Sequence, residues 1–147
     1  MIAAAILLSA AAPAAAPAAG PTSLFLKCAV QGASAGNAHQ LDMVFFDPPP
    51  TWAKGFNFFD PDKLLPAAVT PDVTNNWPAL LQIELDSRIG GNSALIQLAK
   101  DGPLASTARL NVVVINAAGK PQPSYRGTCT VTEGAAAEVE FKGLMKQ

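Results

Sequence analysis

The sequence predicts an all-β protein, an antiparallel β-sandwich or small β-barrel with one disulfide and an insertion rich in proline and aromatic residues. Three observations favour this class. Short runs of alternating apolar and polar residues recur at spacings of roughly 8–14 residues. Turn-forming residues separate these runs, and no long amphipathic helical pattern lies between them. Two cysteines lie near the two ends of the predicted domain.

The first 20 residues are predicted to be a signal peptide. Residues 2–8 are apolar, and a segment of alanine and proline without charged side chains follows, as in an h-region with a small-residue cleavage zone. Pro13 and Pro17 disfavour the competing interpretation, a membrane-spanning helix. We therefore expect residues 21–147 to be a single β domain, periplasmic or secreted, with no stable membrane span after signal cleavage.

The first two predicted strands form a hairpin. Residues 23–30 alternate in polarity, which places Cys28 on the inward face and Lys27 on the outward face. A cluster of small residues at 32–37 predicts a turn, and residues 39–46 alternate again.

Residues 47–77 differ in kind from the rest of the chain. This stretch holds six of the thirteen prolines and both tryptophans, so it cannot form a central strand over its length. We expect a short extended piece at 54–59, with turns at 47–48, 60–61 and 70–71. A loop-rich insertion of this length is uncommon in a compact domain and indicates a functional segment or an unrecognised element.

The strands after residue 78 are easier to recognise. Residues 80–86 and 93–100 alternate on either side of the Gly90-Gly91-Asn92 turn and predict a second hairpin. Residues 107–117 are rich in β-branched side chains and predict a long strand, and residues 125–132 predict another.

The C-terminal segment combines two patterns. Val139 and Phe141 alternate with polar residues as in a strand, whereas the alanine, glutamate and lysine content favours a helix. We expect a final strand at about residues 137–141.

Cys28 and Cys129 are predicted to form a structural disulfide. Cysteines of an exported domain commonly pair, with free buried thiols as the alternative. Their wide spacing excludes a Cys-x-x-Cys redox or zinc motif. In the chain-entropy model, closing a loop of roughly one hundred residues stabilises the fold by up to about 4.7 kcal/mol.

Residues 83–91 (IELDSRIGG) and 125–129 (YRGTC) resemble a group of small, uncharacterised exported bacterial β proteins. In that group an Ile-Asp-Arg-x-Thr-Gly-like hairpin precedes a terminal Gly-x-Cys, whose cysteine bonds a cysteine of an early strand. Here Ser87 separates the aspartate from the arginine. The resemblance implies the topology and the disulfide, and it implies no activity.

Charge and composition exclude several functions. The 10 basic and 11 acidic side chains are scattered along the chain, so no basic stripe indicates nucleic-acid binding. A metal site built from several histidines is impossible with the single His39. Gly90-Gly91 lacks the spacing of a phosphate-binding loop, and we predict no cofactor.

The candidate binding residues are aromatic side chains of the 47–77 insertion. Burial on one face of a regular strand does not explain them, and aromatic side chains supply large contact area at low entropic cost. We expect a patch that binds an unknown protein or a small apolar ligand, with the two tryptophans partly exposed and close together. The alternative is a satellite core that covers one end of the sheet. The residues are Trp52, Phe56, Phe58, Phe59 and Trp77.

A small extracytoplasmic hydrolase is the alternative function. It would use His39 as a base, or the carboxylates of Asp47, Asp60 and Asp62. No Gly-x-Ser-x-Gly nucleophile elbow is present, and Asp-Pro-Asp is also common turn chemistry. We therefore favour an exported binding module and predict no catalytic residue.

Overall fold

The computed structural model describes residues 22–32, 38–66, 69–87, 91–116 and 118–146. The signal peptide predicted for residues 1–20 lies outside the described residues. In the part of the chain that the structure describes, no helix has the length and apolar character to cross a membrane.

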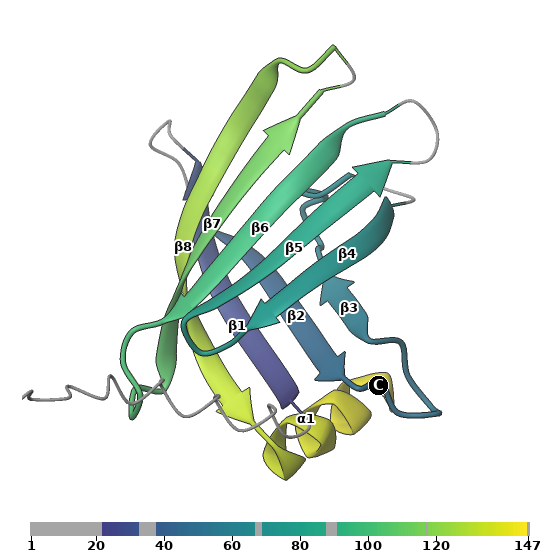
Figure 1. The fold of residues 1–147 in the computed structure, drawn as a ribbon, viewed down its shortest axis with the longest axis vertical. Helices are drawn as coiled ribbons and strands as arrows, with labels where there is room; N and C mark the ends of the chain where they lie inside the picture. The colour runs from purple at the N-terminus through teal and green to yellow at the C-terminus, as the bar shows by residue number, and fades with distance from the viewer. Residues whose placement is uncertain (1–21, 33–37, 67–68, 88–90, 117, 147) are drawn as a thin grey trace, which may run out of the picture.

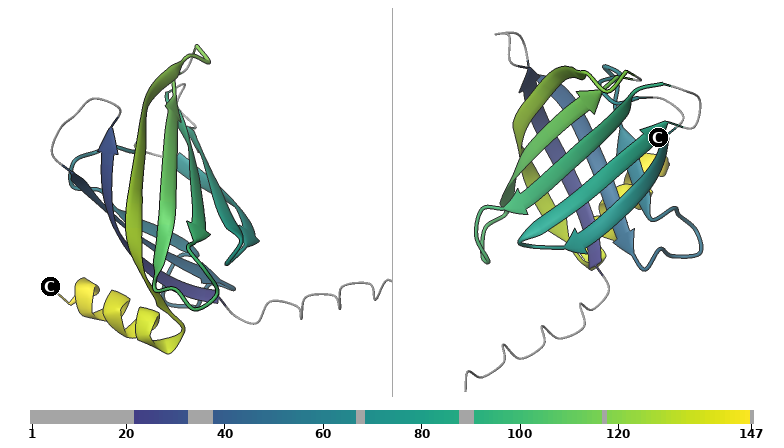
Figure 2. Two further views of the ribbon diagram at one scale, coloured as in Figure 1. Left: turned by 90° about the vertical axis from the view of Figure 1, so that its left-hand side faces the viewer. Right: turned by 45° about the horizontal axis from the view of Figure 1, so that its top comes forward.

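The described residues form one antiparallel sheet and one helix. The sheet order is β3-β2-β1-β8-β7-β6-β5-β4. The pairing of β1 with β8 joins the strands into one sheet. This sheet curls into a nearly closed barrel (Figures 1 and 2), one of the two predicted architectures. The elements are β1 (Thr22–Gly32), β2 (His39–Asp47), β3 (Phe56–Phe59), β4 (Val69–Asn76), β5 (Leu80–Ser87), β6 (Ser93–Lys100), β7 (Thr107–Ile115), β8 (Pro121–Glu133) and α1 (Ala135–Met145).

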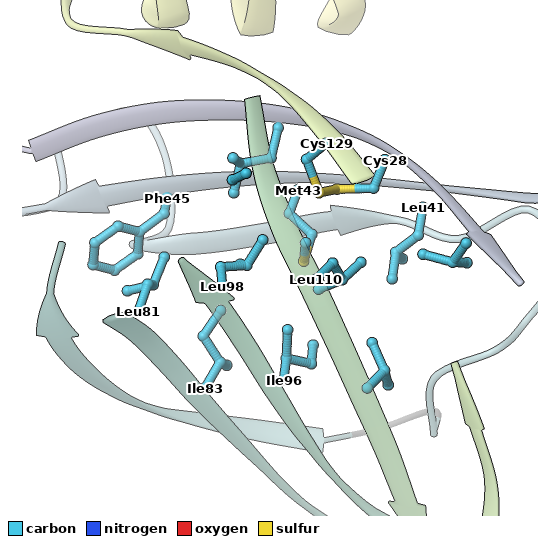
Figure 3. Packing of buried hydrophobic residues seen from close by; sticks show 14 of the residues in the cluster. Cys28, Leu41, Met43, Phe45, Leu81, Ile83, Ile96, Leu98, Leu110 and Cys129 are labelled. Carbon is cyan, nitrogen blue, oxygen red and sulfur yellow. A yellow bond between two sulfur atoms is a disulfide. The ribbon is translucent and has the colours of Figure 1, made fainter. Parts of the chain in front are cut away.

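The main core lies inside the barrel, where alternate side chains of the strands point. Both predicted hairpins are present as β1–β2 and β5–β6, and Lys27 lies on the outward face as expected. Figure 3 shows side chains from opposite walls of the barrel meeting in its interior. The labelled aliphatic and aromatic members are Leu41, Met43, Phe45, Leu81, Ile83, Ile96, Leu98 and Leu110.

The predicted disulfide is present inside this core. Cys28 of β1 and Cys129 of β8 are register partners and are bonded to each other across a sequence separation of 101 residues. Both are almost completely buried (Figure 3). The bond therefore links the two strands whose pairing brings the ends of the chain together.

A close approach of β1 and β8 lies two residues before Cys129. A Cβ atom on Gly127 would collide with the carbonyl oxygen of Ala29 and would lie 2.8 Å from Cγ1 of Val30. Backbone atoms cannot give way as a flexible side chain can. Glycine is therefore required in this Gly-x-Cys sequence by the packing of the two strands.

The prediction of a final strand at 137–141 is wrong, because residues 135–145 form α1. Ala137 and Phe141 are spaced by one helical turn and are both buried, and Leu144 continues the same stripe. Val139 points to solvent with 69% of its surface exposed. The alternation of Val139 and Phe141 is thus a product of helical spacing.

Helix α1 packs on the outer face of the barrel. Figure 2 shows α1 outside the barrel wall. Phe25 of β1 and the β2 residues Val44 and Phe46 are buried in one cluster with Ala137 and Phe141 of the helix. Around Phe25 of β1 and around Val44 and Phe46 of β2, these strands are therefore apolar on both faces, which a purely alternating pattern does not predict.

The predicted turn at 70–71 is also wrong, because Pro71 lies within β4. Proline is tolerated there because β4 is an edge strand, and its missing N–H can face the unpaired side. The turn at 60–61 is confirmed by a hydrogen bond from the N–H of Lys63 to the carbonyl oxygen of Asp60 at 3.1 Å. The predicted extended piece at 54–59 is present as the shorter β3.

Candidate binding site at the seam between β3 and β4

The barrel has a seam where its two edge strands, β3 and β4, are not hydrogen-bonded to each other. A pocket of about 790 Å³ lies at this seam. Figure 1 shows the two strands diverging on the same side of the barrel. Side chains from β2, β3 and β4 supply most of the lining, chiefly Phe45, Phe56, Phe58, Pro71, Val73 and Asn75.

The pocket is lined by the inward faces of both edge strands. Phe56 stands opposite Phe45 in the β2–β3 register, so it points into the barrel, and Phe58 shares its face. The rings of Phe56 and Phe58 lie 5.7 Å apart, measured between centroids. Val73 stands opposite the buried Ile83 on β5 and therefore points inward from the other side. The seam thus gives access to an apolar surface continuous with the core.

Polar side chains hold one end of the seam together. Nδ2 of Asn75 donates to Oδ2 of Asp47 at 3.1 Å and to Oγ1 of Thr22 at 3.4 Å. These bonds join the end of β4 to the end of β2 and the start of β1. Asp47, Lys54 and Asn75 contribute polar side chains to the pocket, and polar and apolar atoms supply comparable shares of its exposed lining.

The five predicted binding residues divide between different surroundings. Phe56 and Phe58 line the seam pocket. Phe59 points to the opposite face of β3 and contacts Phe141 of α1, with ring centroids 6.2 Å apart. The contacts therefore do not gather the aromatic residues in one patch.

Trp52 belongs to the outer cluster beneath α1. Its ring lies 5.6 Å from that of Phe46 and 5.8 Å from that of Phe141, measured between centroids. The ammonium of Lys142 lies 4.6 Å from the ring centroid of Trp52, at the distance of a cation–π interaction. Trp52 remains 39% exposed. Its ring contacts resemble the alternative that we considered for these aromatic residues, a satellite core outside the main one.

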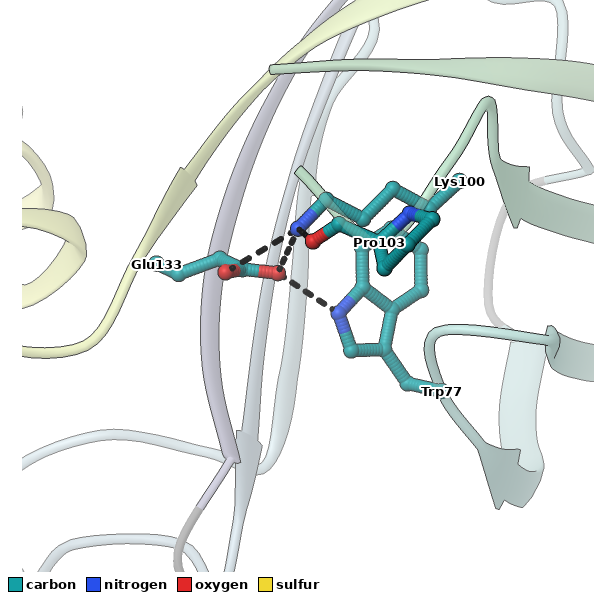
Figure 4. A network of polar contacts seen from close by, with 4 residues as sticks. All are labelled: Trp77, Lys100, Pro103 and Glu133. Carbon is teal, nitrogen blue, oxygen red and sulfur yellow. Dashed lines mark hydrogen bonds and ion pairs between the residues drawn. The ribbon is translucent and has the colours of Figure 1, made fainter. Parts of the chain in front are cut away.

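Trp77 packs against the main core and takes part in a polar network (Figure 4). Its Nε1–H donates to Oε1 of Glu133 at 2.8 Å. The ammonium of Lys100 lies 3.4 Å from the same oxygen and donates to the carbonyl oxygen of Pro103 at 3.2 Å. The network links the residue after β4 to the last residue of β8.

His39 and Asp62 form an exposed pair on the surface. Nδ1 of His39 lies 3.1 Å from Oδ2 of Asp62, and both side chains are at least 40% exposed. The ring of His39 also faces the edge of Tyr125 at 6.3 Å. Within the described ranges, the hydrogen bonds include none between His39 and a serine hydroxyl. Among the described residues, the arrangement pairs a base with a carboxylate and brings no serine hydroxyl into hydrogen-bond contact with His39, as a triad would need.

The three aspartates of the alternative hydrolase have separate partners. The carboxylate of Asp60 accepts hydrogen bonds from the N–H groups of Leu64 and Leu65 at 2.9 and 2.7 Å, which is turn chemistry. Asp62 pairs with His39 and Asp47 with Asn75. Among the described residues, no group of three histidine, cysteine, aspartate or glutamate side chains could hold a metal ion.

Sequence reasoning missed the β4 side of the pocket. Pro71 was expected in a turn, which left Val73 and Asn75 without a place in the sheet. The signal available in the sequence is the spacing of these three residues by two, which places them on one face of an extended strand.

The fold and pocket define an antiparallel β-barrel protein with a lateral pocket. No protein-family model matches the sequence, and no curated protein matches it.

Proposed function

We propose that this protein is an exported binding module that holds a small, elongated and mainly apolar ligand at the seam between β3 and β4. The observation that carries the proposal is the pocket of about 790 Å³ lined by Phe56, Phe58 and Val73. Ligand sites in proteins have volumes of roughly 300–1,000 Å³ and apolar walls with a few polar groups. Eight-stranded barrels have room for side chains or for one small ligand.

The walls of the pocket are held in place by the protein itself, as in a binding site that is formed before the ligand arrives. Phe56 is buried against the core, and the Asn75–Asp47 hydrogen bond fixes the end of β4. A ligand then loses less binding free energy to ordering the protein, since the walls are already in place. The Cys28–Cys129 disulfide favours an oxidising location, periplasmic or secreted.

A fluorescent probe tests the proposal. N-phenylnaphthylamine is a neutral aromatic dye that brightens in apolar surroundings, so we expect saturable brightening with the wild-type protein. Phe58→Ala should weaken its binding about fivefold or more, because part of the apolar wall is removed. Phe59→Ala is the matched control, since Phe59 lies on the opposite face of the same strand and does not line the pocket.

A second variant fills the pocket instead of enlarging it. Val73→Trp should abolish dye binding, whereas Val139→Trp places the same side chain on the exposed face of α1 and should leave binding unchanged. Thermal melts of all variants establish that they are folded. The proposal fails if the wild-type protein does not bind the dye, or if the folded variants and their controls bind it equally.

A further inference from the structure

Lys54 is held at the edge of the seam pocket by its backbone. Nδ2 of Asn57 donates to the carbonyl oxygen of Lys54 at 2.8 Å. The next carbonyl, that of Gly55, accepts from the N–H of Phe46 at 2.7 Å. Because both peptide groups are fixed, the Cα atom of Lys54 has a defined position beside the pocket, while its side chain is exposed and can turn toward a ligand.

The positive charge of Lys54 is not paired with a carboxylate of the described residues. Among the described residues, no carboxylate lies within 4.0 Å of its ammonium group. The other charged residue of the pocket lining, Asp47, already accepts a hydrogen bond from Asn75. An anion in the pocket would gain a charge-assisted hydrogen bond from Lys54 without breaking an existing ion pair.

We infer that the ligand is an amphiphile with an anionic head bound by Lys54 and an apolar chain lying along Phe56, Phe58 and Val73. Medium-chain carboxylates are the chemical class that matches apolar walls with Lys54 at their edge and with Asp47 already hydrogen-bonded to Asn75. The inference rests on the proposed function, because it takes the seam pocket as the binding site.

An added peptide strand fits the seam less well than an alkyl chain. A peptide that extended the sheet at β4 would meet Pro71, which has no N–H to donate. On the other side, β3 offers only four residues, Phe56–Phe59. An alkyl chain needs no backbone partners and gains from the apolar walls alone.

Competition against bound N-phenylnaphthylamine tests the headgroup. Decanoate, decanol and decylamine share one alkyl chain and differ in charge, and each is added below its aggregation limit. We expect decanoate to bind the wild-type protein about threefold to tenfold more tightly than decanol. Lys54→Met should remove this preference by weakening decanoate binding to the level of decanol. Lys120→Met, which removes a lysine outside the pocket, should keep the preference.

The inference is overturned if decanoate and decanol bind the wild-type protein equally, if the preference survives Lys54→Met, or if decylamine binds most tightly through Asp47. In each case dye binding itself would still support the proposed function. A wild-type dimer that Val73→Trp dissociates, measured by light scattering, would mean that a second copy covers the seam, and this would overturn the inference as well.

Discussion

Cys28 and Cys129 stand directly opposite each other on β1 and β8, and their disulfide joins two residues that are 101 positions apart in sequence. β1 and β8 are also hydrogen-bonded neighbours. The bond thus reinforces the non-local pairing that converts two hairpin-rich halves into one sheet.

Reduction of this disulfide should lower the melting temperature by on the order of 10 °C. The chain-entropy model gives up to about 4.7 kcal/mol for a loop of this length, and each kcal/mol shifts a domain of this size by roughly 4 °C. Circular dichroism melts with and without a phosphine reductant measure the shift, with thiol titration to establish that reduction is complete. An unchanged melt after complete reduction would contradict the prediction.

Substituting Gly127 by alanine should destabilise the protein by about 1–3 kcal/mol, because a Cβ atom there overlaps the backbone of Ala29. Gly143→Ala is the control. Nothing lies within 4 Å of a Cβ atom at this helical position, and alanine is a better helix former, so stability should rise by up to about 1 kcal/mol. Urea unfolding measures both values, and equal effects of the two substitutions would refute the packing argument.

The packing of helix α1 on the barrel should depend on the side chain of Phe141 and not on that of Val139. Phe141 is buried and its ring lies near those of Phe46, Trp52 and Phe59, so Phe141→Ala should cost about 3–5 kcal/mol. If the helix detaches before global unfolding, the loss appears as a shift in Trp52 fluorescence. Val139→Ala alters an exposed position and should change stability by less than about 0.5 kcal/mol. Comparable losses at the two positions would contradict this packing.

The strands with one buried face could be predicted from sequence. Leu81, Ile83 and Leu85 are buried while the residues between them face solvent, so the alternation of β5 is visible in the residues themselves. The same reasoning correctly placed Cys28 inward, because every second side chain of β1 around it points into the core.

The missed features depend on partners that are distant in sequence. Pro71 is acceptable in a strand only because β4 lies at the edge of the sheet. Phe46 is buried on the outer face only because α1 covers it. The seam pocket could not be predicted, since its position depends on where the barrel fails to close, which no local pattern encodes.

Loss of the Trp77–Glu133 hydrogen bond and loss of the Lys100–Glu133 ion pair should lower the stability of the protein by different amounts. Trp77→Phe keeps an aromatic ring in place and removes one hydrogen bond, which should cost about 0.5–1.5 kcal/mol. Glu133→Gln keeps an acceptor for Trp77 but removes the charge opposite Lys100, whose side chain is only 10% exposed. Because a buried ammonium without its counter-charge is costly, we expect a larger loss of about 1.5–3 kcal/mol.

A double-mutant cycle separates the stability that comes from the Trp77–Glu133 hydrogen bond from the stability that each residue contributes by other contacts. Because Glu133→Gln keeps the acceptor for the indole, the cycle pairs Trp77→Phe with Glu133→Ala. The double variant should lose less stability than the sum of these single variants, since each of them already removes the shared hydrogen bond. Asp72→Asn, which removes an exposed negative charge on β4, controls for a general change in charge. Additive losses in urea unfolding would mean that the bond between the indole and the carboxylate contributes nothing to stability, and that Trp77 stabilises the barrel by packing alone.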